Sequence, residues 1–462
     1  MDFNKLHSVY FIGIGGIGMS ALARFFHTKG KFVAGYDRTP SELTGELIKT
    51  GIQVHYKDDV EEIPGPVKNA KDKNRVLIVY TPAIPEKHSE LNFLKTSGYI
   101  IKKRSEVLGI IVSNEKGIAI AGTHGKTTVS TLVAHVLYQS SLKCNAFLGG
   151  IAKNYSSNYI FSEASELFVA EADEYDRSFL QLHPEIGAIT AIDPDHLDIY
   201  GEHAELAKAF YQFIKQIKKG GTIVHKKSLE IDKKLNSEIK WFTYAIDDKN
   251  ADFYAENITI DDGIFCFDIH TPQGVIKGFR FGMPGRVNVE NAVAAVAICQ
   301  MAGAKKTELL EGIHSFRGIK RRFDFQIRRN DLVYIDDYAH HPVELKACIS
   351  AVRELYPKRK ITGVFQPHLF SRTFDFAEGF AKSLELLDEL ILMDIYPARE
   401  EPVKGVTSEL IFKKVNMKNK TLCKYEETVE LLKEKDIDVL LTLGAGDIDR
   451  LVEPIRKMLI TS

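Results

Sequence analysis

The segment AGTHGKTT at residues 121–128 constrains the fold of this chain more than any other feature. The apolar residues 117–120 before it are typical of a buried parallel strand, and apolar residues recur at helical spacing over residues 129–137. A strand, a glycine-containing loop and a helix in this order form a phosphate-binding site, because the glycines let backbone N–H groups approach the anion. The segment therefore predicts a parallel α/β domain that binds ATP.

Two side chains of this loop suit nucleotide chemistry. Lys126 is expected to reach the terminal phosphates, and the Thr127 hydroxyl is expected to bind Mg²⁺. Ile120 stands where the longer form of the loop has a further glycine, so only the core G-x-x-G-K-T is present. The alternative is a glycine-rich turn with a solvated lysine, which the flanking strand and helix argue against.

The N-terminal residues predict a second glycine loop. A strand at residues 8–12 leads to Gly13, Gly15 and Gly18, a helical pattern follows, and a strand at residues 32–36 ends at Asp37. A βαβ unit with these glycines and a following acid is typical of dinucleotide-binding folds. This block is predicted to cover residues 1–112, and the polar residues 113–117 are predicted to be a linker.

The remaining chain continues to alternate strands and helices. At 462 residues, and about 150 residues per domain, some three domains are expected. The second is predicted at residues 113–318, with an antiparallel flap over residues 243–281, and the third at residues 319–462. The fold class predicted is α/β, with three domains in series.

Composition excludes several classes of protein. Lysine and arginine number 61 against 62 acidic residues, so net charge predicts neither nucleic-acid nor membrane-surface binding. The five cysteines are scattered and never spaced C-x-x-C, which favours a reducing compartment and disfavours zinc. We find no leader-like N-terminus and no apolar run long enough to span a membrane, and we therefore expect a cytoplasmic protein.

Acidic residues follow the strand predicted at residues 167–170. Glu171 comes first after that strand and is the strongest candidate ligand for Mg²⁺, ahead of Asp173, Glu174 and Asp176. His196 lies between two aspartates beyond a neighbouring strand and is a candidate to bind a second Mg²⁺ or to orient a carboxylate. The alternatives are a solvated acidic turn and a structural histidine.

The third block begins with a basic loop at residues 320–322. Arg322 is a candidate to stabilise charge on a transferring phosphoryl group, and Asp337 to bind a ribose or to position the domain. A solvated basic face is the alternative interpretation.

Two unusual segments follow strands of the third block. Tyr338 and His340 lie in the first, and His368 and Arg372 in the second, and together they could hold a small zwitterion. A transition-metal site at His340 and its neighbours is the alternative, but adjacent histidines point to different sides of an extended chain.

The order of motifs resembles that of the Mur ligases of peptidoglycan synthesis. The resemblance runs from residue 9 to about residue 450 and is carried by G-I-G-G-I-G-M, G-T-H-G-K-T-T, V-A-E-A-D-E, D-P-D-H-L-D, P-G-x-x-N-x-x-N-A, F-x-G-I-K-R-R-F-D, D-D-Y-A-H-H-P and F-Q-P-H-x-F-S-R-T. It implies a Rossmann-like N-terminal domain, a central P-loop ATPase-type domain and a C-terminal Rossmann-like α/β domain. It also implies an ATP- and Mg²⁺-dependent ligase that joins L-alanine to UDP-N-acetylmuramate through an acyl phosphate, acting as a monomer or homodimer, with domain closure.

The resemblance also assigns site residues. The UDP-sugar would contact Gly13, Gly15, Gly16, Gly18, Asp37 and Thr81. ATP would contact Gly122, Thr123, His124, Gly125, Lys126, Thr127, Thr128, Asn291, Arg322 and Asp337, with Thr127, Glu171 and His196 on the metal. Alanine would be held by Tyr338, His340, His368 and Arg372, and the catalytic residues implied are Lys126, His196, Arg322 and His340.

Three residues depart from the family pattern. Ala191 stands where asparagine is usual, Val287 where histidine is usual, and Leu369 where arginine is usual, which leaves Arg372 with more of the amino-acid recognition.

Other functions fit less of the chain. Tyr175 is reminiscent of the related ligase that recycles a murein tripeptide onto UDP-N-acetylmuramate, which is the alternative within the same chemistry. A nicotinamide-dependent dehydrogenase would explain only the first glycine loop, and a P-loop switch would explain only the second.

Overall fold

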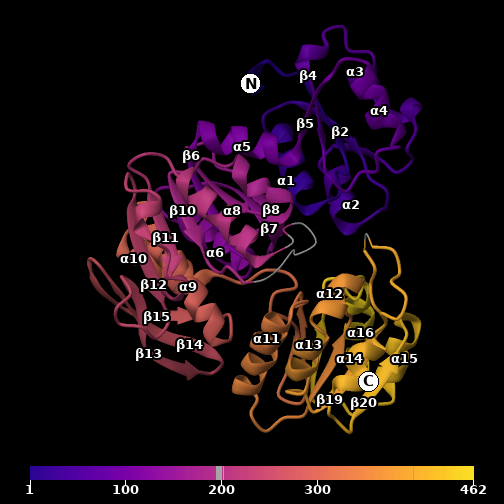
Figure 1. Cartoon of the computed structure of the whole chain (residues 1–462). Coiled ribbons are helices and arrows are strands. Elements are labelled where there is room, and N and C mark those ends of the chain that lie inside the picture. The colour runs from indigo at the N-terminus through magenta and orange to yellow at the C-terminus, as the bar shows by residue number, and fades with distance from the viewer. Residues whose placement is uncertain (194–199, 201, 399, 462) are drawn as a thin grey trace. The chain divides into compact units, whose positions relative to one another are not determined.

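Three β-sheets organise the chain, as Figure 1 shows in a computed structural model that describes residues 1–193, 200, 202–398 and 400–461. By their contacts the described residues divide into two compact units. The first comprises Met1–Glu256, Ile269–Lys277 and Asn291–Phe316, and the second comprises Asn257–Asp268, Gly278–Glu290 and Arg317–Ser462.

The N-terminal sheet has five parallel strands in the order β3-β2-β1-β4-β5. Its strands are β1 (Ser8–Ile12), β2 (Phe32–Tyr36), β3 (Gln53–His55), β4 (Val76–Tyr80) and β5 (Ile100–Lys103). Its helices are α1 (Ile17–Thr28), α2 (Glu42–Lys49), α3 (Gly65–Lys68), α4 (Ser89–Thr96) and α5 (Arg104–Asn114). Alternating residues of β1 belong to different apolar clusters, Val9 and Phe11 to one and Tyr10 and Ile12 to the other, so both faces of the sheet are covered.

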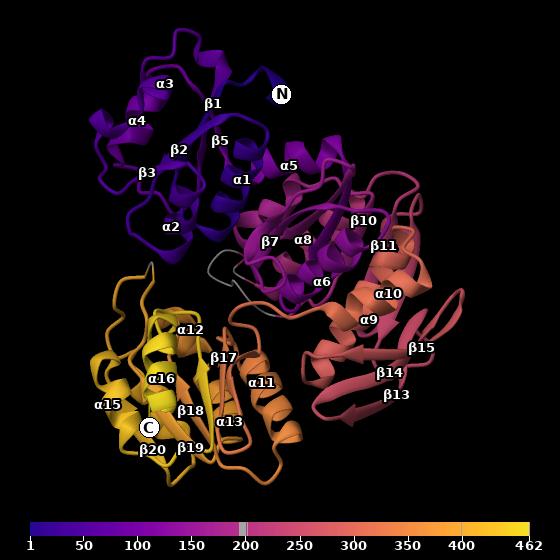
Figure 2. The same ribbon diagram turned by 180° about the vertical axis from the view of Figure 1, so that it is seen from behind.

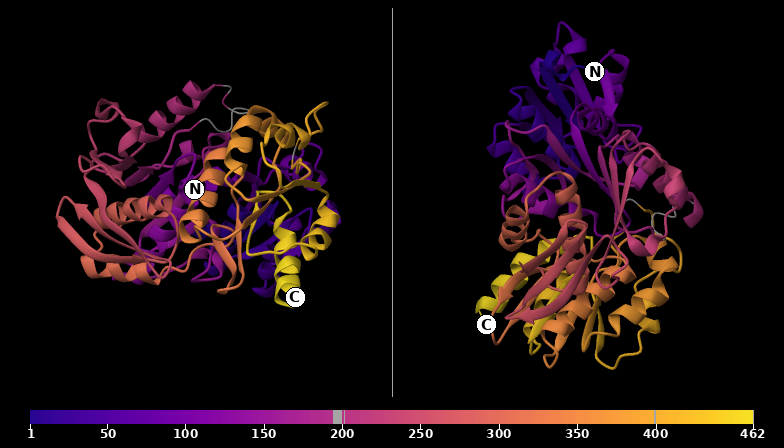
Figure 3. Two further views of the ribbon diagram at one scale, coloured as in Figure 1. Left: turned by 90° about the horizontal axis from the view of Figure 1, so that it is seen from below. Right: turned by 90° about the vertical axis from the view of Figure 1, so that its left-hand side faces the viewer.

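The central sheet has ten strands in the order β15-β14-β13-β12-β11-β10-β6-β9-β7-β8. They are β6 (Lys116–Ala121), β7 (Asn145–Ala152), β8 (Ser157–Ile160), β9 (Leu167–Ala172), β10 (Ile186–Ile189), β11 (Thr222–Lys226), β12 (Lys240–Ala245), β13 (Phe253–Asp261), β14 (Ile264–Thr271) and β15 (Gly274–Phe281). The helices are α6 (Lys126–Gln139), α8 (His203–Lys215), α9 (Arg286–Met301) and α10 (Lys306–Ser315). The predicted flap corresponds to the adjacent strands β13 to β15, seen side by side in Figure 3, whereas β12 pairs in parallel with β11.

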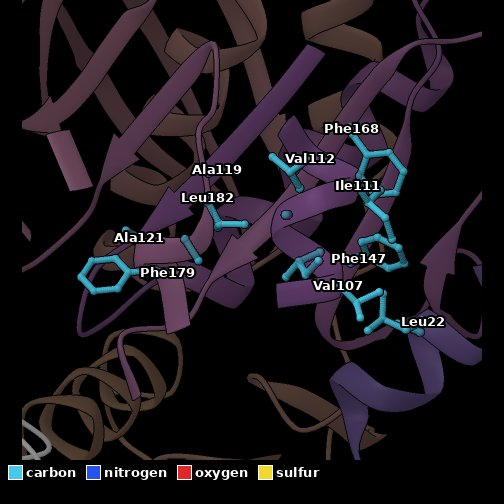
Figure 4. Packing of buried hydrophobic residues seen from close by; sticks show 14 of the residues in the cluster. Leu22, Val107, Ile111, Val112, Ala119, Ala121, Phe147, Phe168, Phe179 and Leu182 are labelled. Atoms are coloured by element: carbon cyan, nitrogen blue, oxygen red, sulfur yellow. The ribbon is translucent and has the colours of Figure 1, made fainter. Parts of the chain in front are cut away.

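One apolar core joins the N-terminal and central sheets. Leu22 of α1 and Ile111 of α5 belong to the same cluster as Phe147 of β7 and Phe168 of β9, and Figure 4 shows these side chains close together. Figure 1 shows α1 beside β7 and β8, Figure 2 shows it beside β7, and the residues of α1 contact both strands. The N-terminal sheet and this side of the central sheet are therefore joined by one apolar core within the first unit.

The sheet of the second unit has six strands in the order β16-β17-β21-β18-β19-β20, with only the β16/β17 pair antiparallel among those described. They are β16 (Asp324–Arg328), β17 (Val333–Asp337), β18 (Ile361–Phe365), β19 (Glu389–Met393), β20 (Lys420–Cys423) and β21 (Val439–Leu443). The helices are α11 (Pro342–Leu355), α12 (Phe370–Asp375), α13 (Ala377–Leu384), α14 (Glu409–Lys414), α15 (Thr428–Lys433) and α16 (Asp449–Thr461). Two apolar clusters cover the sheet, one with α11 and α13 and the other with α15 and α16.

Some boundaries differ from the sequence predictions. The residues predicted as a linker after Val112 are ordered, because α5 runs to Asn114 and β6 begins at Lys116, which leaves Glu115 alone between them. Glu171 lies within β9 rather than after it. Within the described residues, no helix is both long and apolar enough to cross a membrane.

Candidate active site

The phosphate loop lies between β6 and α6, as its sequence predicts. Gly125 precedes α6 with φ +82°, a left-handed conformation that glycine adopts without strain. At Gly122, with φ +139°, a Cβ atom would lie 2.1 Å from Thr190 Oγ1. Thr190 directly follows β10, the strand beside β6 in the sheet, so the chain leaving β10 packs against the loop and only glycine fits at position 122.

The loop side chains converge on the acidic end of β9. Lys126 Nζ lies 2.8 Å from Glu174 Oε1 and also donates to the carbonyl oxygen of Gly122. Thr127 Oγ1 donates to Glu171 Oε1 at 3.1 Å, and Ser130 Oγ donates to Glu171 Oε2 at 3.4 Å. The structure thus brings together the lysine, the threonine and the glutamate predicted to handle phosphate and metal.

Electrostatics keep the lysine charged. Burial disfavours its ammonium, but the carboxylates of Glu174, Asp173 and Glu171 outweigh this effect and raise the pKa of Lys126 above its usual value. A cation held among three carboxylates suits a site that must receive a polyphosphate with its metal.

The other predicted ATP residues of the first unit also surround the loop. The amide oxygen of Asn291 would lie 2.9 Å from a Cβ atom at Gly125, so this side chain contacts the loop. Thr123 Oγ1 accepts a hydrogen bond from the N–H of Asp193 at 3.0 Å, and His124 Nε2 lies 3.8 Å from Asp193 Oδ2. Thr128 is buried in the first turn of α6. His196 lies outside the described residues.

The first glycine loop lies at the carboxyl ends of the N-terminal strands. Gly15 N–H donates to Asp37 Oδ2 at 2.7 Å, and a Cβ atom at Gly13 would lie 2.8 Å from Thr81 Cγ2. Gly16 precedes α1, and Gly18 lies in its first turn. The residues predicted for the UDP-sugar are therefore adjacent.

Sequence analysis missed Arg104. This residue begins α5, its guanidinium would lie 3.0 Å from a Cβ atom at Gly18, and it lies 3.8 Å from Asp173 Oδ2. It thus lies between the glycine loop and the acidic end of β9. The basic run at residues 102–104, which spans the end of β5 and the start of α5, was the available signal.

The residues predicted to hold the amino acid form a cluster in the second unit. Ring centroids of Tyr338 and His340 are 5.1 Å apart, and those of His340 and His368 are 5.9 Å apart. His340 Nδ1 lies 3.2 Å from Glu344 Oε2, and Arg322 lies over the Tyr338 ring at 5.0 Å. Three of the four predicted residues thus meet at the ends of β17 and β18.

Two other polar residues of this region accept hydrogen bonds from backbone N–H groups. Asp337 accepts hydrogen bonds from the N–H groups of Phe323 and Ala339. His341 precedes α11 and accepts from the N–H of Val343 at 3.4 Å, so the adjacent His340 and His341 have different surroundings. Arg372 lies buried on α12.

The three departures from the family pattern have separate surroundings. The carbonyl oxygen of Ala191 accepts from the N–H of Thr123 at 3.0 Å, a contact that any residue could make. Leu369 is buried with φ +69°, and Val287 is exposed. A side chain longer than that of leucine would have to leave the interior at position 369.

Comparison with known proteins gives matches over most of the chain. Family models match at residues 8–116 (Mur ligase family, catalytic domain), 120–299 (Mur ligase middle domain) and 321–446 (Mur ligase, glutamate ligase domain). The UDP-N-acetylmuramate--L-alanine ligase of Parabacteroides distasonis is 51% identical over 459 residues, which are 99% of this chain and 98% of the relative. The ligase of the same name from Porphyromonas gingivalis is 52% identical over 454 residues, 98% of this chain and 99% of the relative.

Solved structures agree with this similarity. The UDP-N-acetylmuramate-alanine ligase of Thermotoga maritima superposes with a TM-score of 0.81 at 25% identity, covering 98% of this chain and 99% of that one. The murein peptide ligase of Psychrobacter arcticus has the same fold, with a TM-score of 0.70 at 20% identity and 98% of each chain covered. With three family models matched in order and half of its residues shared with named ligases, the chain belongs to the Mur ligase family.

Proposed function

We propose that this chain joins L-alanine to the carboxylate of UDP-N-acetylmuramate in an ATP-dependent reaction of peptidoglycan precursor synthesis. Ligases named for that reaction share about half of its residues over nearly its whole length. The observation that carries the proposal is the cluster of Lys126, Thr127 and Glu171 at the carboxyl ends of parallel strands.

The chemistry explains why ATP is needed. A carboxylate is a poor electrophile, and an ammonium that meets it forms an ion pair rather than an amide. Transfer of the γ-phosphoryl group to the carboxylate oxygen releases ADP and gives an acyl phosphate. The amine nitrogen then forms a bond to the carbonyl carbon and gives up a proton. Cleavage of the carbon–oxygen bond to phosphate completes the amide.

The donor atoms fit Mg²⁺. The Thr127 hydroxyl and the Glu171 carboxylate are hard oxygen ligands 3.1 Å apart, as this ion prefers. A Cβ atom at Gly149 of β7 would lie 2.2 Å from Glu171 Oε2, so only glycine leaves the carboxylate room to face Thr127. A bound magnesium ion would neutralise charge on the β- and γ-phosphates. We assign His196 to a second ion on the family resemblance.

The first unit would bind both nucleotides. Lys126 would hold the terminal phosphates, and Asn291 would contact the adenine end. The backbone N–H groups of the loop at residues 13–18 would receive the UDP diphosphate at the start of α1, with Asp37 and Thr81 in the same crevice.

The second unit would bind the acceptor. Tyr338, His340 and His368 form a cluster of polar rings that can surround a small zwitterion, and Arg372 would pair with its carboxylate. Glu344, 3.2 Å from His340 Nδ1, would orient this imidazole as a base for the amine proton. Arg322 would stabilise charge on the transferring phosphoryl group.

Further parts of the proposal concern organisation. We assign the UDP-sugar, ATP and amino-acid functions to residues 1–112, 113–318 and 319–462 respectively. We place the reaction in the cytoplasm, since all five cysteines are free thiols. We expect a monomer or a homodimer.

The test is phosphate release with ATP, Mg²⁺ and UDP-N-acetylmuramate, with each acceptor added in turn. Release is expected with L-alanine and to a smaller extent with glycine or L-serine, and it should require the UDP-sugar. Release with a murein tripeptide but not with L-alanine would replace the proposal with the recycling ligase. Release without any acceptor or UDP-sugar would indicate a simple ATPase.

A further inference from the structure

Glu174 lies beside the phosphate loop without a role in the reaction described above. It follows β9 and precedes the short 3₁₀ helix η4 (Tyr175–Gln181). Its side chain is 0% exposed, and its Oε1 is 2.8 Å from the ammonium of Lys126. A fully buried carboxylate of the acidic cluster therefore contacts the lysine of the loop.

The ammonium of Lys126 is directed by this contact. A lysine has three N–H donors. One points to Glu174 Oε1 and another to the carbonyl oxygen of Gly122, with the carbonyl oxygen of Thr123 at 3.5 Å. The flexible side chain is thus fixed across its own loop by oxygen atoms of the protein.

The position of Glu174 is itself fixed. Its carbonyl oxygen accepts a hydrogen bond from the Tyr200 hydroxyl at 2.7 Å and another from the N–H of Arg177 at 3.0 Å. Tyr200 is buried, and the guanidinium of Arg177 lies over its ring at 5.2 Å. The carboxylate therefore extends toward Lys126 from a backbone position that is held by two hydrogen bonds.

Stability alone does not explain this pair. A buried ion pair is often no more stabilising than apolar residues of the same size, because both charges lose their hydration. A fixed direction for a long side chain, by contrast, lowers the entropy lost when the phosphate reaches its transferring position.

We propose that Glu174 is a positioning residue, which holds the Lys126 ammonium across the phosphate loop so that the N–H of its longest contact, 3.5 Å from the Thr123 carbonyl oxygen, can turn to the transferring phosphate. The proposal rests on the proposed function. Glu174 does not touch the reacting atoms. It acts only through Lys126, so the uncharged side-chain oxygen of a glutamine in the same place should hold the ammonium nearly as well.

The first experiment tests the pair without substrates. Thermal unfolding is measured for wild type, Lys126→Met, Glu174→Gln and the double variant. Lys126→Met is expected to lower Tm by about 5 °C, because it leaves a buried carboxylate without its cation, and Glu174→Gln in that background is expected to restore most of the loss. Losses that simply add would overturn the proposal.

The second experiment separates positioning from folding. Glu174→Ala is expected to lower kcat for phosphate release about 100-fold, with the KM for ATP changed less than threefold, because the lysine is misplaced rather than removed. Glu174→Gln should stay within tenfold of wild-type kcat. The control is Glu185→Gln, the same substitution at a partly exposed carboxylate 3.7 Å from Lys218, which should leave kcat unchanged.

The outcomes are distinguishable. Undiminished kcat in Glu174→Ala, or equal losses for alanine and glutamine, would overturn the positioning role. If the wild type released no phosphate with any acceptor, the proposed function would fail, while the unfolding cycle would still report on the pair.

Discussion

Two glutamates in the first unit are equally buried and differently partnered. Glu90 and Glu174 are both 0% exposed. Glu90, at the start of α4, accepts from the Tyr10 hydroxyl and from the N–H of Asp59 at 3.2 Å, and the same hydroxyl lies 2.7 Å from His55 Nε2. Glu174, beside the phosphate loop, faces the ammonium of Lys126.

Burial and the partner act in opposite directions on the pKa of each carboxylate. Burial raises the pKa of Glu90 to about 7, and its hydrogen bonds offset this rise only in part. At Glu174, burial also raises the pKa to about 7, because the charge of Lys126 offsets the effect of burial only in part, while the carboxylates around Lys126 raise the pKa of that lysine. Burial therefore raises the pKa of both carboxylates, and the two sites differ in the partner, which is a hydroxyl and a backbone N–H at Glu90 and an ammonium at Glu174.

The largest expected effect comes from removing the cation. Lys126→Ala should lower phosphate release at least about 1000-fold, because the terminal phosphates lose their positive partner. UDP-N-acetylmuramate affinity, measured by calorimetry, should stay within about twofold, because that site is formed by a different loop. The control is Lys116→Ala, at the exposed start of β6, the strand that leads into the phosphate loop. A large loss of UDP-sugar affinity would mean that the domain roles are misassigned.

Next in size is the pH dependence that Glu90 causes. The pKa of Glu90 is about 7 in the folded chain and 4.5 for an ordinary glutamate, as in the unfolded chain. Between these two pH values the folded state therefore binds a proton that the unfolded state has lost. The free energy of unfolding should therefore fall by up to about 3 kcal/mol as pH rises from 4.5 to 7, and then level off. Glu90→Gln should remove this fall and should be the more stable protein at pH 8.

Denaturant unfolding at several pH values measures this effect. The difference between wild type and Glu90→Gln isolates Glu90 from His55 and His88, whose pKa values burial lowers and which act with the opposite sign. Asp58 and Asp59 also face the group and are common to both proteins. Parallel stability curves for the two proteins would contradict the assignment.

A third and smaller effect tests the hydroxyl partner. Tyr10→Phe should cost about 2 kcal/mol of unfolding free energy above pH 7, because ionised Glu90 loses a donor in a buried site. The same change should move the pH midpoint of Glu90 upward, since the Tyr10 hydrogen bond lowers its pKa. Tyr99→Phe, whose hydroxyl donates only to backbone carbonyls, is the matched control. An unmoved midpoint would contradict the proposed role of the hydroxyl.

The contrast between the two glutamates also separates what sequence can and cannot predict. The phosphate loop was predictable because its chemistry is local: Gly125, Lys126 and Thr127 are consecutive, and a strand and a helix flank them. The fold class followed in the same way from alternating apolar periods, and the α/β prediction is confirmed by the three sheets. The binding and catalytic roles assigned to individual residues remain predictions, although the side chains assigned to one ligand lie close together in several cases.

The partners of buried polar groups were not predictable. Glu90 contacts Tyr10, 80 positions away, and Lys126 contacts Glu174 across 48 positions, so no local pattern links either pair. Arg104 is a further example, because the fold and not the local sequence places it beside Gly18. The polar residues 113–117 resembled a linker because polarity does not distinguish a loop from the exposed end of a helix.

Asp37 is a partly exposed carboxylate with which the two buried glutamates can be compared. Its substitution is expected to have the smallest effect on stability. Its carboxylate is only partly buried and accepts from the N–H groups of Gly15 and Thr39. Asp37→Asn should change the free energy of unfolding by less than about 0.5 kcal/mol, since the amide oxygen can still accept one of these bonds and no buried charge is involved. UDP-N-acetylmuramate affinity should fall about fivefold, near 1 kcal/mol, because the glycine loop loses a charged acceptor. Calorimetry and denaturant unfolding measure the two quantities separately. A stability loss as large as that of Tyr10→Phe would mean that exposure does not separate this carboxylate from the buried ones.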